Sequence, residues 1–472
     1  MSVKPAELTG PAVEVPELPQ ATVESAELSE ATVELVKLPE PTVELVKLPE
    51  PTVELVELPE PTVEPPEPEP APVAVIPAPV ASRPAASGRR LDGVDGLRAL
   101  AALWVLVFHA WSATGASLGP LSLLVTSGSI GVSLFLVLSG FCLYLPVVRA
   151  GHQIRVRSFL RRRALRLLPT YYVTLVLLVV LTPLAAGHWG LYQYSGAELA
   201  AQTVAHLTMT ESLFPSTFYG INGSYWSLAL EWQLYLALPL LVIGIRRFGL
   251  ARTVLAVVAL NVVYRIGLQL LIDTQVIPGN SLMATAVLIN LLPGRWAEFA
   301  FGMVAAELYV SGRIGWVASR LGWGLLLMVP VAVALHELGD PLEHVAFGVV
   351  FFLLLSLVVA RNNPVARLFA WRPLAALGVM SYSLYLVHQP LIGAAAYLFL
   401  SHGSSPRLAF MGAILLIPLI VAVAWGLFVT VERRTIRSSG SPAAGSPEAL
   451  LMAPLRRLRA WRSPATRVSP AG

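Results

Sequence analysis

Two ionisable residues lie in the segment LRALAALWVLVFHAW, Leu97 to Trp111, which otherwise has the apolar composition of a membrane helix. Arg98 stands near its start, and His109 follows eleven residues later. Eleven residues turn an α-helix through about three full circles and advance it by about 16 Å, so the two side chains share one helix face. A neutral imidazole can accept a proton near neutral pH, and a guanidinium can bind an anion. Because ionisable groups that face lipid cost free energy, this face is expected to point into the protein.

Further polar residues interrupt other apolar segments. Glu231 lies in SYWSLALEWQLYLALP, Arg295 and Glu298 lie in LPGRWAEFAFG, and His388 lies in GVMSYSLYLVHQPL. Polar groups in different membrane helices must face the bundle interior or a wet cavity, so these residues are expected to form a polar pathway with those of the first segment. Arg295 and Glu298 stand three residues apart on one helix face and can neutralise each other, which favours a structural role for this pair.

The composition is that of a membrane protein. Of the 472 residues, 55% are hydrophobic and 13% are charged, and the mean hydropathy is +0.67. A chain this apolar and this weakly charged is not a soluble globular enzyme. We expect an all-α polytopic membrane protein in the plasma membrane. The single cysteine, Cys142, excludes an intramolecular disulfide and a multi-cysteine metal site.

The first 80 residues differ in charge from the rest. They contain 16 Glu and 3 Lys, whereas the remainder has 30 Arg and 13 acidic residues. Residues 11–70 repeat with a ten-residue period, as in ATVELVKLPE and PTVELVKLPE. Frequent proline and little apolar surface disfavour a helix or a core. Residues 1–88 are therefore predicted to be a disordered acidic tail and linker, acting as a solvated spacer or as a docking arm for a basic partner. Residues 433–472 are predicted to be a short basic disordered tail.

Apolar runs alternate with short polar joints from residue 97 onward. At about 20 residues for each crossing, the pattern predicts ten transmembrane helices in a membrane domain over residues 89–432. The sixth run contains Pro293 and Gly294, which predict a kink or a re-entrant segment. The predicted spans are 97–114, 128–148, 168–187, 225–245, 251–272, 284–310, 322–338, 345–360, 374–396 and 408–430.

The arginines predict the orientation of this bundle. They cluster on alternate joints, and the other joints have almost none except Arg407 at a border. By the positive-inside rule, both termini are then cytoplasmic, which agrees with an even number of spans. In this topology Arg98 lies at the cytoplasmic mouth and His109 lies past the middle of the membrane. The basic balance therefore indicates no nucleic-acid partner, and no basic region with interleaved aromatic residues suggests one.

Six blocks of the sequence, in order, resemble the integral membrane acyltransferase family 3 over residues 89–432. Arg98 and His109 have the family's Arg-x10-His spacing, and Arg163 and Arg166 have its Arg-x-x-Arg spacing. Members O-acylate bacterial lipopolysaccharide, peptidoglycan, exopolysaccharides, macrolides and nodulation factors. The resemblance implies an O-acyltransferase with an acyl-coenzyme A donor, most commonly acetyl. The blocks are LDGVDGLRALAALWVLVFHA, GVSLFLVLSGFCLYLP, FLRRRALRLLPTYY, YWSLALEWQLYLALP, RWAEFAFGM and GVMSYSLYLVHQPL.

The chain departs from the family pattern in two places. The first block contains two Asp-Gly pairs, and the spacing to Arg98 favours Asp95 over Asp92 as the matching aspartate. Some members also carry a soluble C-terminal hydrolase-like domain, whereas about 40 residues follow residue 432 here. We therefore expect the site to be presented directly to the acceptor.

Acyl transfer from a thioester to an alcohol requires removal of the hydroxyl proton as the oxygen attacks. The unperturbed pKa of imidazole suits this task, so we expect His109 to be the general base. We expect Glu231 to be the second catalytic residue, which would orient the acceptor or hold His109 in the correct tautomer. The other reading of Glu231 is a hydrogen-bonded contact between helices.

The donor is expected to bind at the cytoplasmic side. Arg98, Arg163 and Arg166 can bind its phosphate groups through paired hydrogen bonds. The arginine cluster could instead act only by fixing the orientation of the helices in the membrane. Arg98 could instead form an ion pair with Asp95. No bound cofactor is expected, because acyl-coenzyme A is a substrate, and no His-x3-His or similar cluster indicates a metal.

The acceptor is expected to be a hydroxylated glycan, a glycolipid or a small molecule such as a macrolide sugar. Trp226, Ser227, Tyr235 and His388 are the expected substrate contacts, whereas tyrosines 382 and 385 are expected to pack or to lie at the membrane interface.

Two further mechanisms stay open. Ser139 or Cys142 could form an acyl-enzyme intermediate, although neither has an obvious base in the sequence. A proton-coupled transporter would also embed His, Glu and Arg along a polar path, although the halves of the chain show no repeated motif.

Overall fold

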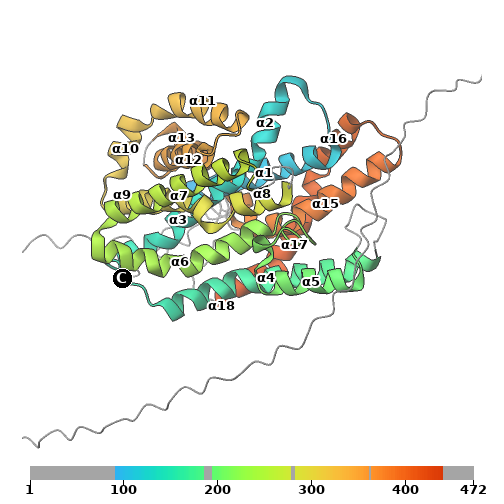
Figure 1. Cartoon of the computed structure of the whole chain (residues 1–472), viewed down its shortest axis with the longest axis horizontal. Helices are drawn as coiled ribbons and strands as arrows, with labels where there is room; N and C mark the ends of the chain where they lie inside the picture. The colour runs from blue at the N-terminus through green and yellow to red at the C-terminus, as the bar shows by residue number, and fades with distance from the viewer. Residues whose placement is uncertain (1–90, 185–193, 278–281, 361–362, 439–472) are drawn as a thin grey trace, which may run out of the picture. The chain divides into compact units, whose positions relative to one another are not determined.

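The computed structural model describes residues 91–184, 194–277, 282–360 and 363–438 (Figure 1). Within these ranges the chain is helical and has no strand. The predicted tail at residues 1–88 lies outside the described residues, as does residue 439 onward of the predicted C-terminal tail.

Eight longer helices form the bundle. They are α1 (Asp92–Thr114), α3 (Gly131–Arg149), α4 (Val156–Leu184), α6 (Trp226–Phe248), α7 (Leu250–Asp273), α9 (Leu292–Val310), α12 (Glu343–Val359) and α15 (Ser381–Ser401). Shorter elements connect them: α2 (Ser122–Thr126), α5 (Gly196–Leu207), α8 (Leu282–Ile289), α10 (Ile314–Leu321), α11 (Gly324–Glu337), α13 (Pro364–Phe369), α14 (Arg372–Val379), α16 (Pro406–Leu415), α17 (Ile417–Leu427) and α18 (Arg433–Ser438). Three single turns, η1 (Gly119–Leu121), η2 (Ser127–Ile130) and η3 (Glu211–Leu213), are 3-10 helical, and η4 (Phe428–Glu432) is π-helical.

The helices confirm a multi-pass membrane protein, whereas the number of ten spans stays a prediction. Six segments among the described residues are long and apolar enough to cross a membrane, and two bent helix pairs raise this number to eight. The pairs are α10 with α11, bent by 74°, and α16 with the helical segment that follows it to residue 436, bent by 43°. Each of the ten predicted spans overlaps at least one helix of the described residues. However, α9 contains three charged residues, and α12 has only 17 residues.

Close packing of α3 against α9 fixes one wall of the bundle. A Cβ atom on Gly140 would lie 2.0 Å from the backbone oxygen of Phe299, and one on Gly302 would lie 2.0 Å from that of Val137. The two backbones can approach this closely only because both residues are glycines, as is common where membrane helices pack. This contact fixes the position of α3, whose other residues include Ser139 and Cys142.

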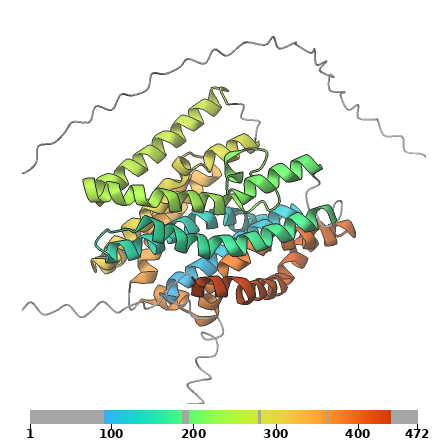
Figure 2. The same cartoon turned by 90° about the horizontal axis from the view of Figure 1, so that it is seen from below.

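The first helix, α1, has a central place in the packing. It contacts α3, α14 and α15, and it carries both Arg98 and His109. Figure 2 shows α7 at one edge of the bundle and the red C-terminal helices at the opposite edge. Because α1 contacts both α3 and α15, helices from both halves of the chain position its polar residues.

Candidate active site

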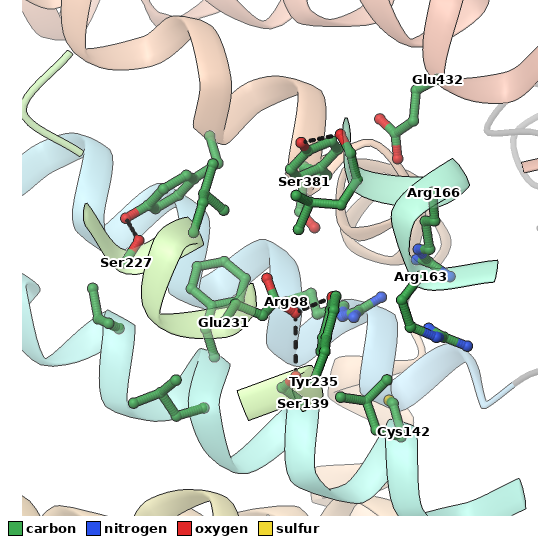
Figure 3. A pocket seen from close by; sticks show the side chains of 18 of the residues that line it. Arg98, Ser139, Cys142, Arg163, Arg166, Ser227, Glu231, Tyr235, Ser381 and Glu432 are labelled. Carbon is green, nitrogen blue, oxygen red and sulfur yellow. Dashed lines mark hydrogen bonds between the residues drawn. The ribbon is translucent and has the colours of Figure 1, made fainter. Parts of the chain in front are cut away.

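A cavity of about 300 Å³ lies among α1, α3, α4, α6, α15 and the turn η4 (Figure 3). Its walls bring together residues that are up to 334 positions apart in the sequence, from Arg98 to Glu432. Six residues that the sequence identified as site residues line the cavity, namely Arg98, Arg163, Arg166, Ser227, Glu231 and Tyr235. Three others, His109, Trp226 and His388, do not line it.

Three arginines give one part of the cavity a positive charge. Arg98 comes from α1, and Arg163 and Arg166 come from α4, one turn apart. All three side chains are half-buried, and none forms a hydrogen bond or an ion pair with another described residue. Asp95 stands three residues before Arg98 on α1 and interacts with it electrostatically, so the alternative pairing of these two residues stays a prediction. Arg163 lies over the ring of Phe159, 5.9 Å from its centroid. Half-buried guanidinium groups that lack hydrogen-bonded acceptors are costly, so this part of the cavity favours an anion.

Glu231 is held by hydrogen bonds inside the cavity. Its Oε1 atom accepts one from Tyr235 OH (2.7 Å) and one from Ser139 Oγ (3.2 Å), as the dashed lines in Figure 3 show. Of the two roles expected of Glu231, the one that needs a hydrogen bond to His109 has no such bond in the described residues, whereas its role in orienting the acceptor stays a prediction. Tyr235 is thus a partner of Glu231. Ser139, in turn, has a carboxylate partner that the sequence did not indicate.

His109 pairs with another histidine. Its Nδ1 atom lies 2.9 Å from the backbone oxygen of Val105 and 3.1 Å from Nε2 of His388. In His388, Nδ1 lies 2.8 Å from the backbone oxygen of Tyr385. A carbonyl oxygen can only accept, so each Nδ1 carries a hydrogen in the neutral ring. The single hydrogen on His109 Nδ1 is then shared between two acceptors, the backbone oxygen of Val105 and Nε2 of His388, and His109 Nε2 has a lone pair without a hydrogen-bond partner in the described residues.

Tyr385 connects this histidine pair to the cavity. Its ring centroid lies 5.2 Å from that of His388, and its hydroxyl lies 2.6 Å from Ser227 Oγ on the cavity wall. Sequence reasoning treated Tyr385 as a packing residue. Its spacing of one helical turn from His388 is the only sequence signal that could have singled it out.

Asn222 holds the beginning of α6 beside α15. Its Nδ2 atom donates to the backbone oxygen of Leu386 (3.0 Å), and its Oδ1 atom accepts from the backbone nitrogen and the hydroxyl of Ser224 (3.1 and 2.8 Å). The preceding Ile221 has φ 53°. This value is unusual for a β-branched residue, and such strain persists only where surrounding contacts enforce it. These contacts place Ser227 next to Tyr385.

Trp226 points elsewhere. Its ring stacks on Phe218, with centroids 5.2 Å apart and an interplanar angle of 18°. The structure therefore places this expected substrate contact in the packing beneath the start of α6, outside the cavity lining.

Glu432 lines the cavity and was missed by sequence reasoning. It ends the π-helical turn η4, is 1% exposed and accepts a hydrogen bond from Ser383 Oγ (2.5 Å). Single π-helical turns are rare and occur often at functional sites. No sequence signal indicates Glu432, because it stands two residues beyond the predicted end of the last span.

The predicted pairing of Arg295 with Glu298 is confirmed. Arg295 Nε lies 3.0 Å from Glu298 Oε2, and both side chains are buried. Arg295 also contacts Ser133 Oγ (3.0 Å) and His344 Nε2 (2.6 Å), so it joins α3, α9 and α12. Among the described residues, no group of three or more His, Cys, Asp or Glu could hold a metal ion.

The sequence is similar to those of known acyltransferases. O-acetyltransferase OatA of Staphylococcus aureus is 22% identical over 368 residues, which are 74% of this chain and 58% of OatA, so the chain spans less than two thirds of that protein. Acyltransferase MdmB of Streptomyces mycarofaciens is 28% identical over 381 residues, which are 76% of this chain and 95% of MdmB. No solved structure matches the chain. A family model described as an acyltransferase domain matches residues 91–429, which include every residue that lines the cavity except Glu432. The chain therefore belongs to acyltransferase family 3, and it is a multi-pass membrane protein of that family.

Proposed function

We propose that the protein transfers an acyl group from acyl-coenzyme A to a hydroxyl group of a glycan, a glycolipid or a secondary metabolite. The donor is cytoplasmic, the acyl group is acetyl in the simplest case, and the protein resides in the plasma membrane with both termini in the cytoplasm. Membership of the acyltransferase family supports acyl transfer, and the name of OatA supports transfer to oxygen.

The observation that carries the donor assignment is the set of three unpaired arginines in the cavity. Coenzyme A brings several phosphate charges, and guanidinium groups bind phosphate through two parallel hydrogen bonds. Three arginines face two cavity carboxylates, Glu231 and Glu432, so the lining has one excess positive charge when all five groups are ionised. An anionic donor would supply the partners that the guanidinium groups lack.

The histidine pair supports a general-base mechanism. As the acceptor oxygen attacks the thioester carbonyl carbon, Nε2 of His109 removes the hydroxyl proton. His388 Nε2 accepts the hydrogen of His109 Nδ1, so it orients the ring and stabilises the imidazolium that forms. His388 thus takes the role expected of Glu231, which instead organises Ser139 and Tyr235 inside the cavity.

Binding and turnover by the purified full chain in detergent test this proposal. Acetyl-coenzyme A should bind, measured by titration calorimetry, and free coenzyme A should appear slowly by hydrolysis, measured by chromatography. Arg98→Ala should weaken binding about 10- to 100-fold, the loss of one charge-assisted contact. Arg98→Lys should bind acetyl-coenzyme A more tightly than Arg98→Ala but less tightly than the parental protein, because an ammonium keeps the charge but lacks the planar geometry of a guanidinium.

A matched control and a second variant complete the test. Arg246→Gln removes an exposed arginine at the end of α6 and should leave binding unchanged. Binding that is unaffected in both Arg98→Ala and Arg163→Ala would contradict the donor assignment. A protein that moves protons across vesicles but never releases coenzyme A would instead be the transporter that the embedded polar residues also allow.

A further inference from the structure

Two hydroxyl groups meet on the wall of the cavity that adjoins the histidine pair. Ser227 Oγ, on α6, lies 2.6 Å from Tyr385 OH, on α15, and both residues line the cavity (Figure 3). The backbone oxygen of Tyr385 also accepts the Nδ1 hydrogen of His388, one helical turn further along α15. The ring of Tyr385 also lies against that of His388, with centroids 5.2 Å apart, so the residue that carries one of the two hydroxyls contacts both the arginine-lined cavity and the histidine pair.

The hydrogen bonds of this pair leave one donor that can be redirected. Ser227 Oγ lies 3.1 Å, and Tyr385 OH 3.2 Å, from the same acceptor, the backbone oxygen of Ser224. One hydroxyl can donate to this oxygen while the other donates to its neighbour. If a stronger acceptor enters the cavity, the Tyr385 hydroxyl can turn to it while Ser227 stays bonded to Ser224. A ligand oxygen can thus be bound without leaving a buried hydroxyl unpaired.

The position of Ser227 in its helix favours negative charge at this place. Ser227 is the second residue of α6, a helix of 23 residues. The first turn of a helix has backbone N–H groups without intrahelical acceptors and a partial positive charge. Asn222, bonded to Leu386, keeps this helix end beside Tyr385. Hydroxyl donors fixed near a helix N-terminus are a preorganised site for an oxyanion.

We propose that the Tyr385–Ser227 hydroxyl pair donates a hydrogen bond to the carbonyl oxygen of the acyl group as that oxygen becomes an oxyanion. This inference rests on the proposed acyl transfer. In the step, a bond forms between the acceptor oxygen and the carbonyl carbon, the hydroxyl proton passes to His109, and the carbonyl π electrons move onto the bound oxygen. The electrons then return, the carbon–sulfur bond breaks, and the coenzyme A thiolate leaves and takes the proton from His109.

Steady-state hydrolysis of acetyl-coenzyme A by the purified full chain in detergent tests the assignment. Because the hydrogen bond strengthens only in the transition state, Tyr385→Phe should lower kcat about 10²- to 10³-fold. Its KM for acetyl-coenzyme A should change little, since ground-state binding is kept. Ser227→Ala should behave in the same way, and the double variant should be about as slow as the slower single variant, because the two hydroxyls act as one unit.

The control variant removes a tyrosine hydroxyl far from the cavity. Tyr264 OH donates to the backbone oxygen of Leu288 (2.7 Å) and does not line the cavity, so Tyr264→Phe should keep the parental kcat. Thermal unfolding in the same detergent checks that each variant is folded.

The outcomes separate this inference from the proposed function. A parental protein that releases no coenzyme A overturns the proposed function and, with it, the inference. An active parental protein with a fully active Tyr385→Phe overturns the inference alone. A Tyr385→Phe variant that raises KM while keeping kcat also overturns it, because the hydroxyl would then bind the donor in the ground state.

Discussion

The imidazole rings of His109 and His388 lie 4.9 Å apart at an interplanar angle of 64°, and one ring nitrogen of each faces the other. They come from α1 and α15, 279 residues apart in the sequence. The backbone oxygens of Val105 and Tyr385 fix the tautomer of each ring, and this leaves Nε2 of His109 as the lone pair that can accept a proton. In the mechanism we propose, His109 is the base and His388 is the residue that orients it.

Substitution of the two histidines should separate these roles. His109→Ala should reduce acyl transfer about 10²- to 10⁴-fold while acetyl-coenzyme A still binds, because proton removal matters only during attack. His388→Ala should cause a smaller loss. His388→Gln should recover part of it, because the amide oxygen can replace Nε2 as acceptor. Coenzyme A release and donor titration measure the two effects.

The exposed His402, at the end of α15, provides the control for this series. His402→Ala should keep the parental rate. A folded His109→Ala protein that transfers acyl groups at the parental rate would show that His109 is a packing residue. Equal activities of His388→Gln and His388→Ala would remove the proposed hydrogen-bond role of His388.

The close packing of α3 against α9 should depend on the glycines at their contact, which have no side chain. Gly302→Ala places a methyl group 2.0 Å from the backbone oxygen of Val137, so the helices must separate and the free energy of unfolding should fall by about 1–3 kcal/mol, as for an overpacked core. Gly267→Ala, on α7, meets no atom within 4 Å and should have no such cost. Thermal unfolding in detergent compares the two variants. Equal melting temperatures would show that the close approach is not required.

Sequence reasoning recovered the residues that share a helix or a motif, and it failed where the contact depends on packing. Arg98, Arg163 and Arg166 could be assigned to one site because the family motifs and the predicted topology place all three at the cytoplasmic side. The pairing of His109 could not, because no spacing rule indicates which of two distant helices lies beside α1. Glu231 was the only carboxylate considered as its partner, yet helix packing places His388 there.

Apolar helices were located for a similar reason, since hydropathy is a local property, but only six to eight segments among the described residues qualify as membrane spans. Each of the ten predicted segments overlaps at least one helix, although the ninth begins at Ser381, whereas residue 374 was predicted as its start. The preceding apolar residues belong to α14, which packs against α1. Apolar composition cannot distinguish a residue that packs on a neighbouring helix from one that faces lipid, so the exact length of a span cannot be predicted from it.

The orientation of the membrane domain can be tested with reporter fusions. If the arginine-rich joints are cytoplasmic, as the positive-inside rule predicts, reporters after residues 150, 248 and 435 should give cytoplasmic signals. A reporter after residue 205, within α5, should give an external signal. Alkaline phosphatase and a fluorescent protein, which are active on opposite sides of the membrane, serve as paired readouts. A cytoplasmic signal at 205 would contradict both the orientation and the ten-span topology.

The last prediction concerns Glu211, which lies outside the spans in the turn η3. Its side chain is fully buried and accepts a hydrogen bond from Tyr171 OH (3.0 Å), and burial raises its pKa to about 8. A carboxyl group whose pKa is higher in the folded state is protonated there while the unfolded chain ionises. The stability of the protein should therefore fall as the pH rises from about 4.5, the ordinary pKa, to about 8.

Glu211→Gln should remove this pH dependence, because the amide cannot ionise. Since one pKa unit corresponds to about 1.4 kcal/mol, the stability of Glu211→Gln relative to the parental protein should rise by a few kcal/mol between pH 5 and pH 8. Melting temperatures of both proteins in detergent at the two pH values measure this difference, with Asp273→Asn as an exposed acidic control. A Glu211→Gln variant whose melting temperature follows the parental protein at both pH values would show that Glu211 is ionised in the folded state, and the burial argument would then be wrong.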